Sequence, residues 1–81
     1  MFRGHLKIII LKSLSDKPSS GYGIMKQLEA IMGTKPSSGS IYPVLEELTK
    51  EGIISAKEEG RSKIYSLTKK GETEFKNIEK Q

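Results

Sequence analysis

Residues 37–52 read SSGSIYPVLEELTKEG, and this stretch decides the fold. It begins with serines that can cap a helix and ends on a glycine that can stop one, so a helix is predicted at about residues 38–51. A proline is tolerated only near the first turn, so either the helix starts close to Gly39 or its first turn bends at Pro43. Both alternatives leave free backbone amides pointing outward near the start of the helix. The apolar stripe of this helix, spaced i, i+3, i+4 and i+7, is Ile41, Val44, Leu45 and Leu48.

Two further helices precede this stretch. The spacing of apolar residues predicts one helix at about residues 3–15 and a second at about residues 21–32. A serine-rich and proline-containing segment separates them, and Ser19 or Ser20 can cap the second helix. Gly33 stands where a left-handed residue is expected to end it. The predicted core positions are Leu6, Ile9, Ile10 and Leu14, widened by Ile8 and Leu11, in the first helix and Ile24, Leu28 and Ile31 in the second.

Downstream of residue 52 the apolar period changes from about 3.6 to about 2, which is typical of strands. This alternation predicts a two-stranded hairpin over residues 53–67, with Tyr65 and Leu67 on its core face. Thr68 can cap a last helix at about residues 69–81. The apolar face of that helix is thin, so it must pack on the rest of the chain to be stable.

Together these elements predict a single domain over residues 1–81. The fold class is mainly α with a small β-hairpin: a winged helix-turn-helix with a three-helix core, a two-stranded wing and a short C-terminal helix. In this arrangement the third helix can enter a DNA major groove, which is about 12 Å wide, while the hairpin tip reaches a neighbouring groove or the backbone.

Composition excludes several classes of protein. The 81 residues carry a net charge of +4, no cysteine and a single histidine, His5, so disulfides and the usual metal sites are excluded. No nucleophile with a base, carboxylate pair or phosphate loop can be assembled, so we predict that the chain is not an enzyme and binds no cofactor. The longest apolar run, residues 8–11, is too short for a membrane span or a secretory signal, which predicts a cytoplasmic protein.

Polar and basic side chains gather where such a domain would meet the phosphates of double-stranded DNA, the predicted partner. Amides and hydroxyls at the start of the third helix can donate to phosphate oxygens, helped by the positive end of the helix dipole. Lys69 and Lys70 lie in the first turn of the last helix, where a cation opposes the dipole, so stability does not explain their placement. The candidates are Lys35, Ser37, Ser38, Gly39 and Ser40 at the helix start and Lys57, Arg61 and Lys63 in the hairpin.

Several short motifs follow one another across about residues 3–75. They include Gly21-Tyr22-Gly23, the run from Pro36 to Pro43, Gly52-Ile53-Ile54 and Tyr65-Ser66-Leu67-Thr68. In this order and spacing the chain resembles the PadR family of bacterial and archaeal transcriptional regulators. The resemblance implies a dimeric DNA-binding repressor whose third helix reads a palindromic operator. Carried over residue by residue, it implies Ser38, Ser40 and Tyr42 at the DNA face, Tyr22 near the backbone, and Arg61 and Lys63 on the wing.

The sequence departs from the family pattern at two places. Glu46 and Glu47 occupy the outward side of the third helix, where the family often carries basic residues. Carboxylates that face phosphates are unfavourable, so we expect only the N-terminal half of this helix to enter the groove. Family members also continue past the wing into a longer dimer-forming segment, whereas only a short segment follows Leu67 here. The alternative dimer contacts are Leu6, Phe75 and Ile78.

One other function remains open at this point, a winged helix used for protein–protein interaction within a larger assembly. Such a domain keeps the same core but lacks a basic DNA face. The discriminating feature is whether Lys35, Arg61, Lys63 and the serine-rich helix start gather on one side. Family members respond to small molecules such as phenolic acids, but the sequence assigns no effector, operator or regulated gene.

Overall fold

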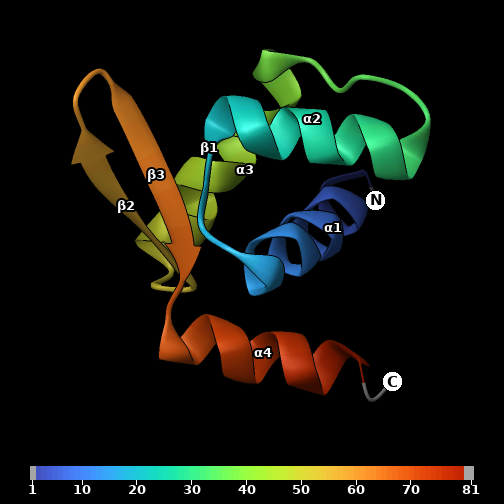
Figure 1. Cartoon of the computed structure of the whole chain (residues 1–81). Helices are drawn as coiled ribbons and strands as arrows, with labels where there is room; N and C mark the ends of the chain where they lie inside the picture. Colours follow the sequence, from blue (N-terminus) through green and yellow to red (C-terminus); the bar gives the residue numbers. More distant parts are fainter. Residues whose placement is uncertain (1, 80–81) are drawn as a thin grey trace.

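The computed structural model describes residues 2–79, with side chains from residue 6 onward (Figure 1). Within these residues it has four helices and a three-stranded antiparallel sheet of order β1-β3-β2. The elements are α1 (Phe2–Asp16), β1 (Ser19–Ser20), α2 (Gly21–Met32), α3 (Ser38–Lys50), β2 (Ile54–Glu59), β3 (Ser62–Leu67) and α4 (Lys69–Glu79). This confirms the predicted winged helix-turn-helix fold class. Residues 80 and 81, included in the predicted last helix, lie outside the described residues.

The strand β1 is a feature that the sequence pattern does not predict. Ser19 lies opposite Tyr65 and Ser20 lies opposite Ile64, so the two serines extend the hairpin sheet along the free edge of β3. Ser20 also caps α2, because its hydroxyl accepts a hydrogen bond from the backbone N–H of Gly23 at 3.0 Å. The start of α2 is therefore fastened to the wing.

The core lies where α1, α2, α3 and the base of the wing meet. Two positions expected in it are exposed instead: Ile8 is 43% exposed and Ile31 is 52% exposed. The last turn of α2 extends beyond the core, since Met32 is exposed as well. No helix within residues 2–79 is both long and apolar enough to cross a membrane. The buried apolar residues are Leu6, Ile10, Leu11, Leu14, Ile24, Leu28, Ile41, Val44, Leu45, Leu48, Ile53, Ile54 and Tyr65.

The helix α3 begins at Ser38, one residue before Gly39, and contains Pro43 in its second turn. The amide hydrogen that proline lacks would have bonded the carbonyl of Gly39, so that carbonyl loses its helical partner. At the other end, Gly52 has a left-handed φ of +76°. The backbone N–H of Ile53 donates to the carbonyl of Leu48 at 3.0 Å, which completes the usual glycine-terminated helix end.

The helix α4 starts where α3 and the wing end, at a junction that we call the Thr68 joint, formed by Gly52, Ile53, Thr68 and Gly71. The backbone N–H of Thr68 donates to the carbonyl of Ile53 at 3.1 Å, and the Thr68 hydroxyl accepts from the N–H of Gly71 at 3.0 Å. A methyl group on Gly71 would collide with the carbonyl oxygen of Ile53, so the two backbones are in direct contact. Only glycine permits this approach.

Lys70 has a structural partner beside this joint. Its ammonium group donates a hydrogen bond to the carbonyl oxygen of Glu51 at 2.8 Å, at the C-terminal end of α3. A cation at that end complements the negative pole of the α3 dipole, which offsets its unfavourable position in the first turn of α4. The placement of Lys70 is therefore explained by stability, contrary to the expectation from sequence.

Gly71→Ala is expected to lower the free energy of unfolding by about 1–3 kcal/mol, because the added methyl collides with a backbone oxygen that cannot move aside. Helix propensity alone predicts the opposite sign, since alanine is favoured over glycine within a helix by about 1 kcal/mol. Gly39→Ala is the matched control, because the nearest atom outside its own helix backbone, Ser37 Oγ, would lie 3.8 Å away. Urea denaturation measures both variants, and equal effects would contradict the close approach at Gly71.

Candidate nucleic-acid interface

The N-terminus of α3 presents unused hydrogen-bond donors. Ser37 has the extended backbone of a helix cap, with φ −80° and ψ 155°, but its side chain makes no capping bond. Its hydroxyl lies 3.1 Å from the hydroxyl of Ser40 instead. The carbonyl of Ser37 accepts hydrogen bonds from the amides of Ser40 and Ile41. The amides of Ser38 and Gly39 lie in the first turn of the helix, where no preceding helical carbonyl is available to them. These amides and the exposed hydroxyls of Ser37, Ser38 and Ser40 can all donate to an anion.

The ring of Tyr42 rests on the first residue of α2. A methyl group on Gly21 would lie 2.7 Å from the hydroxyl oxygen of Tyr42 and 2.9 Å from its Cε1 atom, so the glycine makes room for the ring. Tyr42 is nevertheless 43% exposed, which agrees with its position off the apolar stripe of α3. Tyr22, the next residue of α2, is 61% exposed. The ammonium of Lys26 lies 5.9 Å from the centroid of its ring.

A groove of about 230 Å³ brings four predicted site residues together, and we call it the tyrosine groove. Tyr22 comes from α2, Tyr42 from α3, and Arg61 and Lys63 come from the turn and first half of β3. The other lining residues carry no sequence signal for a site, because their role depends on the pairing of β1 with β3. They are Ser20, Gly21, Ser62 and Tyr65.

Tyr65 forms the floor of the tyrosine groove. Its side chain is 8% exposed and belongs to the core, as its position on the strand predicts. Burial, followed by the neighbouring Tyr42 and Glu46, raises the pKa of its hydroxyl above the ordinary value. The Tyr65 hydroxyl therefore stays protonated to a higher pH than that of an exposed tyrosine.

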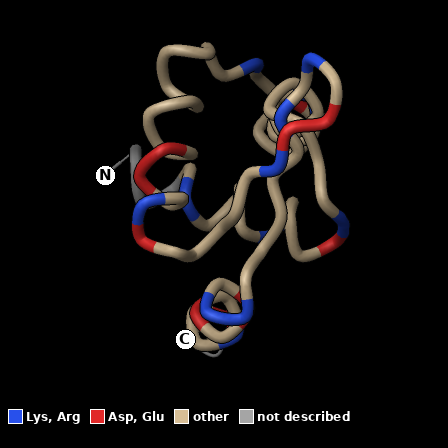
Figure 2. Tube along the Cα trace, turned by 90° about the vertical axis from the view of Figure 1, so that its left-hand side faces the viewer, with Lys and Arg blue, Asp and Glu red and all other residues tan. Residues whose placement is uncertain are grey.

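The remaining predicted residues lie at the start of α3 and along the wing. Lys35 is exposed in the loop before α3, and Lys57 is exposed on β2. Figures 1 and 2 show the hairpin tip and the start of α3 at the same end of the molecule, with basic positions at both. The wing is not purely basic, because Glu58 lies opposite Lys63 in the strand register. The gathering of these groups on one side is the arrangement expected of a DNA-binding winged helix.

The residues predicted as dimer contacts have roles within one chain. Leu6 is 8% exposed and belongs to the core, and Phe75 and Ile78 are half-buried and pack against it. Leu6 therefore offers little surface to a partner. Lys7 and Glu74 form an ion pair of 3.6 Å that joins α1 to α4 beside them.

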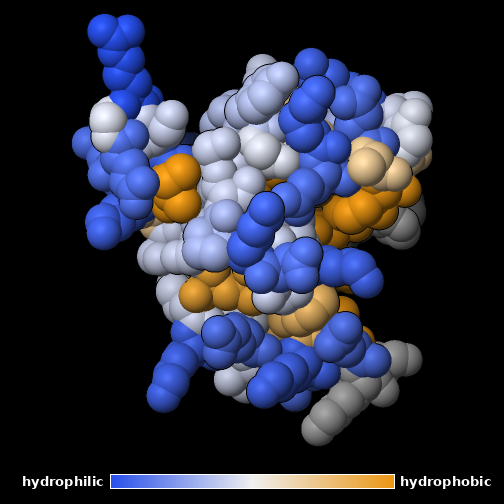
Figure 3. All heavy atoms as spheres, viewed as in Figure 1, coloured by the Kyte–Doolittle hydropathy of each residue, from blue (hydrophilic) through white to orange (hydrophobic). Residues whose placement is uncertain are grey.

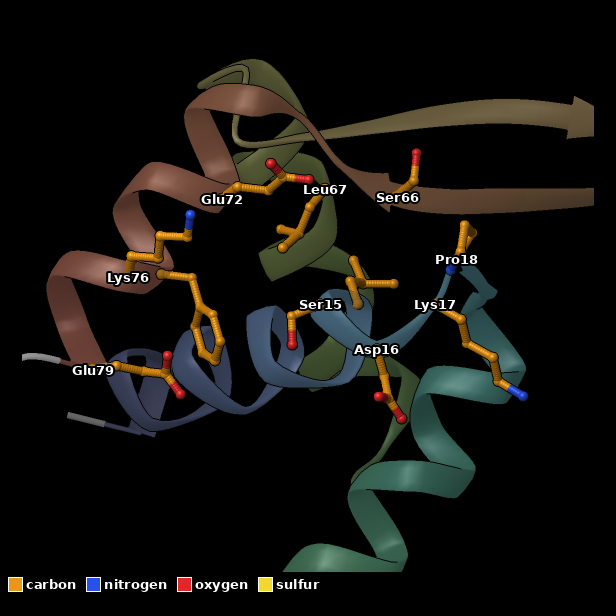
Figure 4. A pocket seen from close by; sticks show the side chains of 11 residues that line it. Ser15, Asp16, Lys17, Pro18, Ser66, Leu67, Glu72, Lys76 and Glu79 are labelled. Atoms are coloured by element: carbon orange, nitrogen blue, oxygen red, sulfur yellow. The ribbon is translucent and has the colours of Figure 1, made fainter.

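A larger hollow of about 470 Å³ separates α4 from the end of α1, away from the tyrosine groove. In Figure 3 hydrophobic residues show between α4 and the rest of the molecule, where Leu14, Leu67 and Phe75 line this hollow. Figure 4 shows its charged rim, with Glu72, Lys76 and Glu79 on α4 facing the end of α1. Within the described residues, no group of three or more histidine, cysteine or acidic side chains could hold a metal ion.

Comparison with known sequences gives one family. The model of the family described as "Transcriptional regulator PadR-like family" matches residues 10–77. Among curated proteins, the chain is 38% identical over 71 residues to the transcriptional regulator YqjI of Escherichia coli strain K12. That match covers 84% of this chain and 34% of the regulator, so the chain spans about a third of the length of the curated relatives it matches. Transcriptional regulators are not enzymes, in agreement with the prediction from composition.

Solved structures give the same fold. A PadR-like transcription factor from Bacteroides fragilis superimposes with a TM-score of 0.89 at 27% identity, covering 98% of this chain and 81% of that chain. Halobacterium salinarum RosR gives a TM-score of 0.88 at 26% identity, covering 93% and 69%. Bacillus subtilis PadR in complex with operator DNA gives a TM-score of 0.77 at 32% identity, covering 90% of this chain and 45% of that chain.

Gly21→Ala is expected to destabilise the domain only while the Tyr42 ring is present, because the added methyl comes too close to that ring. In a double-mutant cycle with Tyr42→Ala, the coupling energy should be about 0.5–3 kcal/mol, as found for side chains in contact. Urea denaturation of the four proteins measures it. An equal cost of Gly21→Ala in both backgrounds would show that the ring does not rest on Gly21.

Proposed function

The chain belongs to the PadR-like family of transcriptional regulators, and on that premise we propose that it is a sequence-specific DNA-binding regulator, a repressor that binds a palindromic operator as a dimer. The observation that carries the proposal is the tyrosine groove beside the start of α3. Four elements, β1, α2, α3 and β3, contribute residues to it, and all of its predicted side chains suit phosphate. The proposal implies action in the cytoplasm, where the DNA is.

The groups around the tyrosine groove would divide the contacts to DNA between them. Arg61 and Lys63 supply positive charge for phosphates beside the wing, and Lys35 supplies it beside α3. The hydroxyls of Tyr22 and Tyr42 and those of Ser37, Ser38 and Ser40 donate to phosphate oxygens or base edges. These phosphate contacts would fix the register of α3 in the major groove, and contacts to base edges would supply the sequence preference.

A solved relative supports the proposal that the bound DNA is an operator. Bacillus subtilis PadR, 32% identical to this chain, has been solved in complex with operator DNA. An operator that is palindromic requires two copies of the domain related by a two-fold axis. For the contact between copies we propose the exposed edges of Phe75 and Ile78 on α4, with Leu6 as part of the core against which both pack. No effector is part of the proposal.

The affinity for duplex DNA is expected to fall by about 40-fold between roughly 50 and 200 mM salt. The figure follows if Lys35, Arg61 and Lys63 each neutralise one phosphate, since each such contact contributes about −0.9 to the slope of log K against log salt. Fluorescence anisotropy with a labelled fragment selected from genomic DNA measures this slope. If no duplex is retained at low salt, or if the affinity is indifferent to salt, the DNA-binding function is wrong and the protein-interaction alternative is favoured.

Tyr42→Ala and Arg61→Ala should each weaken operator binding by roughly tenfold, because each loses a hydrogen bond to a charged group, and should leave the melting temperature nearly unchanged. Arg61→Ala should also reduce the salt slope by about 0.9. Lys76→Ala is the matched control, since α4 lies at the opposite end of the molecule from the hairpin tip (Figure 1). A variant that unfolds while its folded fraction binds normally would remove that residue from the interface.

A further inference from the structure

We propose that Glu46 is a base-reading residue, whose carboxylate accepts a hydrogen bond from the exocyclic amino group of a cytosine in the major groove. It would make cytosine the preferred base at one position of each bound site. The proposal rests on the proposed DNA-binding function and deepens it by naming a residue that sets sequence preference.

Glu46 lies on the side of α3 that carries Tyr42, which is proposed to contact DNA. Glu46 follows Tyr42 by four residues, and at about 100° per residue the two side chains lie on the same side of the helix, one turn apart. The buried stripe faces the other way, and Glu46 itself is exposed. Any duplex that contacts Tyr42 and follows α3 for one more turn therefore meets this carboxylate.

The neighbourhood of Glu46 supports the same placement. Its charge is among the causes that raise the pKa of Tyr65, after burial and Tyr42. Tyr65 and Tyr42 both line the tyrosine groove. This agrees with the helix geometry, which puts Glu46 one turn after Tyr42 on the same side of α3.

Within the described part of the chain, no contact neutralises the charge of the Glu46 carboxylate. Among residues 6–79, no hydrogen bond or ion pair to Glu46 is found, although Lys50 follows it by four residues on the same helix. Glu46 is also far from the first turn of α3, where an acidic side chain would favour the helix dipole. An unpaired carboxylate beside a polyanion costs affinity unless DNA supplies a donor.

The edges of the bases decide which donor it would be. In the major groove, cytosine presents the N4 amino group as its hydrogen-bonding group, whereas adenine places the N7 acceptor beside its N6 amino group and guanine presents two acceptors. A carboxylate is attracted to the N4 amino group of cytosine and is repelled by the acceptors of adenine and guanine. The same charge is repelled by phosphates, so it weakens binding to DNA that lacks the cytosine. Attraction to the correct base and repulsion from other DNA therefore both raise specificity.

This role requires more of α3 to enter the groove than the N-terminal half that the sequence predicts. The carboxylates of Glu46 and Glu47 argue for insertion of the N-terminal half alone if they face phosphates. A carboxylate that faces a base edge removes that objection for Glu46, and insertion then extends one turn beyond Tyr42.

The test uses the full chain and a library of random duplexes. Wild type, Glu46→Gln, Glu46→Ala and the control Glu47→Gln, which removes the same charge from the adjacent position of α3, are each used to select bound sequences. Wild type and Glu47→Gln should enrich cytosine at a shared position. Both Glu46 variants should lose that enrichment while keeping the other positions, and glutamine should shift it towards adenine, its usual partner.

Titration of two duplexes that differ only by C·G or T·A at that position gives the magnitude. Wild type should prefer cytosine on the order of tenfold to a hundredfold, and Glu46→Ala should bind both equally. If the wild type selects sequences but the Glu46 variants select the same ones, the role of Glu46 is wrong and the DNA-binding function stands. If the wild type retains no duplex at low salt, the DNA-binding function itself fails and this inference fails with it.

Discussion

The base of the wing is held by one backbone contact, between the first turn of α4 and the carbonyl oxygen of Ile53. Because Gly71 has no side chain, α4 approaches that carbonyl closely enough for Thr68 to bond both sides of the junction. The end of α3, the base of the wing and the start of α4 are therefore held at one point. The wing starts from this point and, together with α2 and α3, contributes residues to the tyrosine groove, which Arg61 and Tyr42 both line.

Local signals in the sequence predict most of the fold, because caps and stripes act within a few residues. Ser20 and Thr68 cap the helices expected to follow them, and Gly33 and Gly52 have the left-handed backbone expected at helix ends. Strand β1 is different, since two residues carry no periodicity and Ser19 becomes a strand only through the edge that β3 offers. Ile31 is exposed because the last turn of α2 extends beyond the core. The spacing of apolar residues in the sequence does not show where a helix extends past the elements that it packs on.

The candidate site was predictable as a list of residues but not as a surface. Sequence placed Tyr22, Tyr42 and Arg61 among the candidates, yet their convergence depends on Gly21 admitting the Tyr42 ring and on β1 fixing α2 to the wing. The site also combines two kinds of chemistry. Lysine, arginine and hydroxyl groups suit any phosphate and give affinity, whereas the carboxylate of Glu46, in its proposed role, discriminates among bases.

The pairing of Ser19 and Ser20 with β3 has a thermodynamic consequence for recognition. A hairpin attached to the domain only at its base would fluctuate, and a partner would have to immobilise it on arrival. Here the edge of β3 is bonded to the segment that begins α2, so the hairpin and the two helices it adjoins lose this freedom during folding. The entropy of ordering the wing is then absent from the free energy of association, and a modest set of contacts suffices for a stable complex.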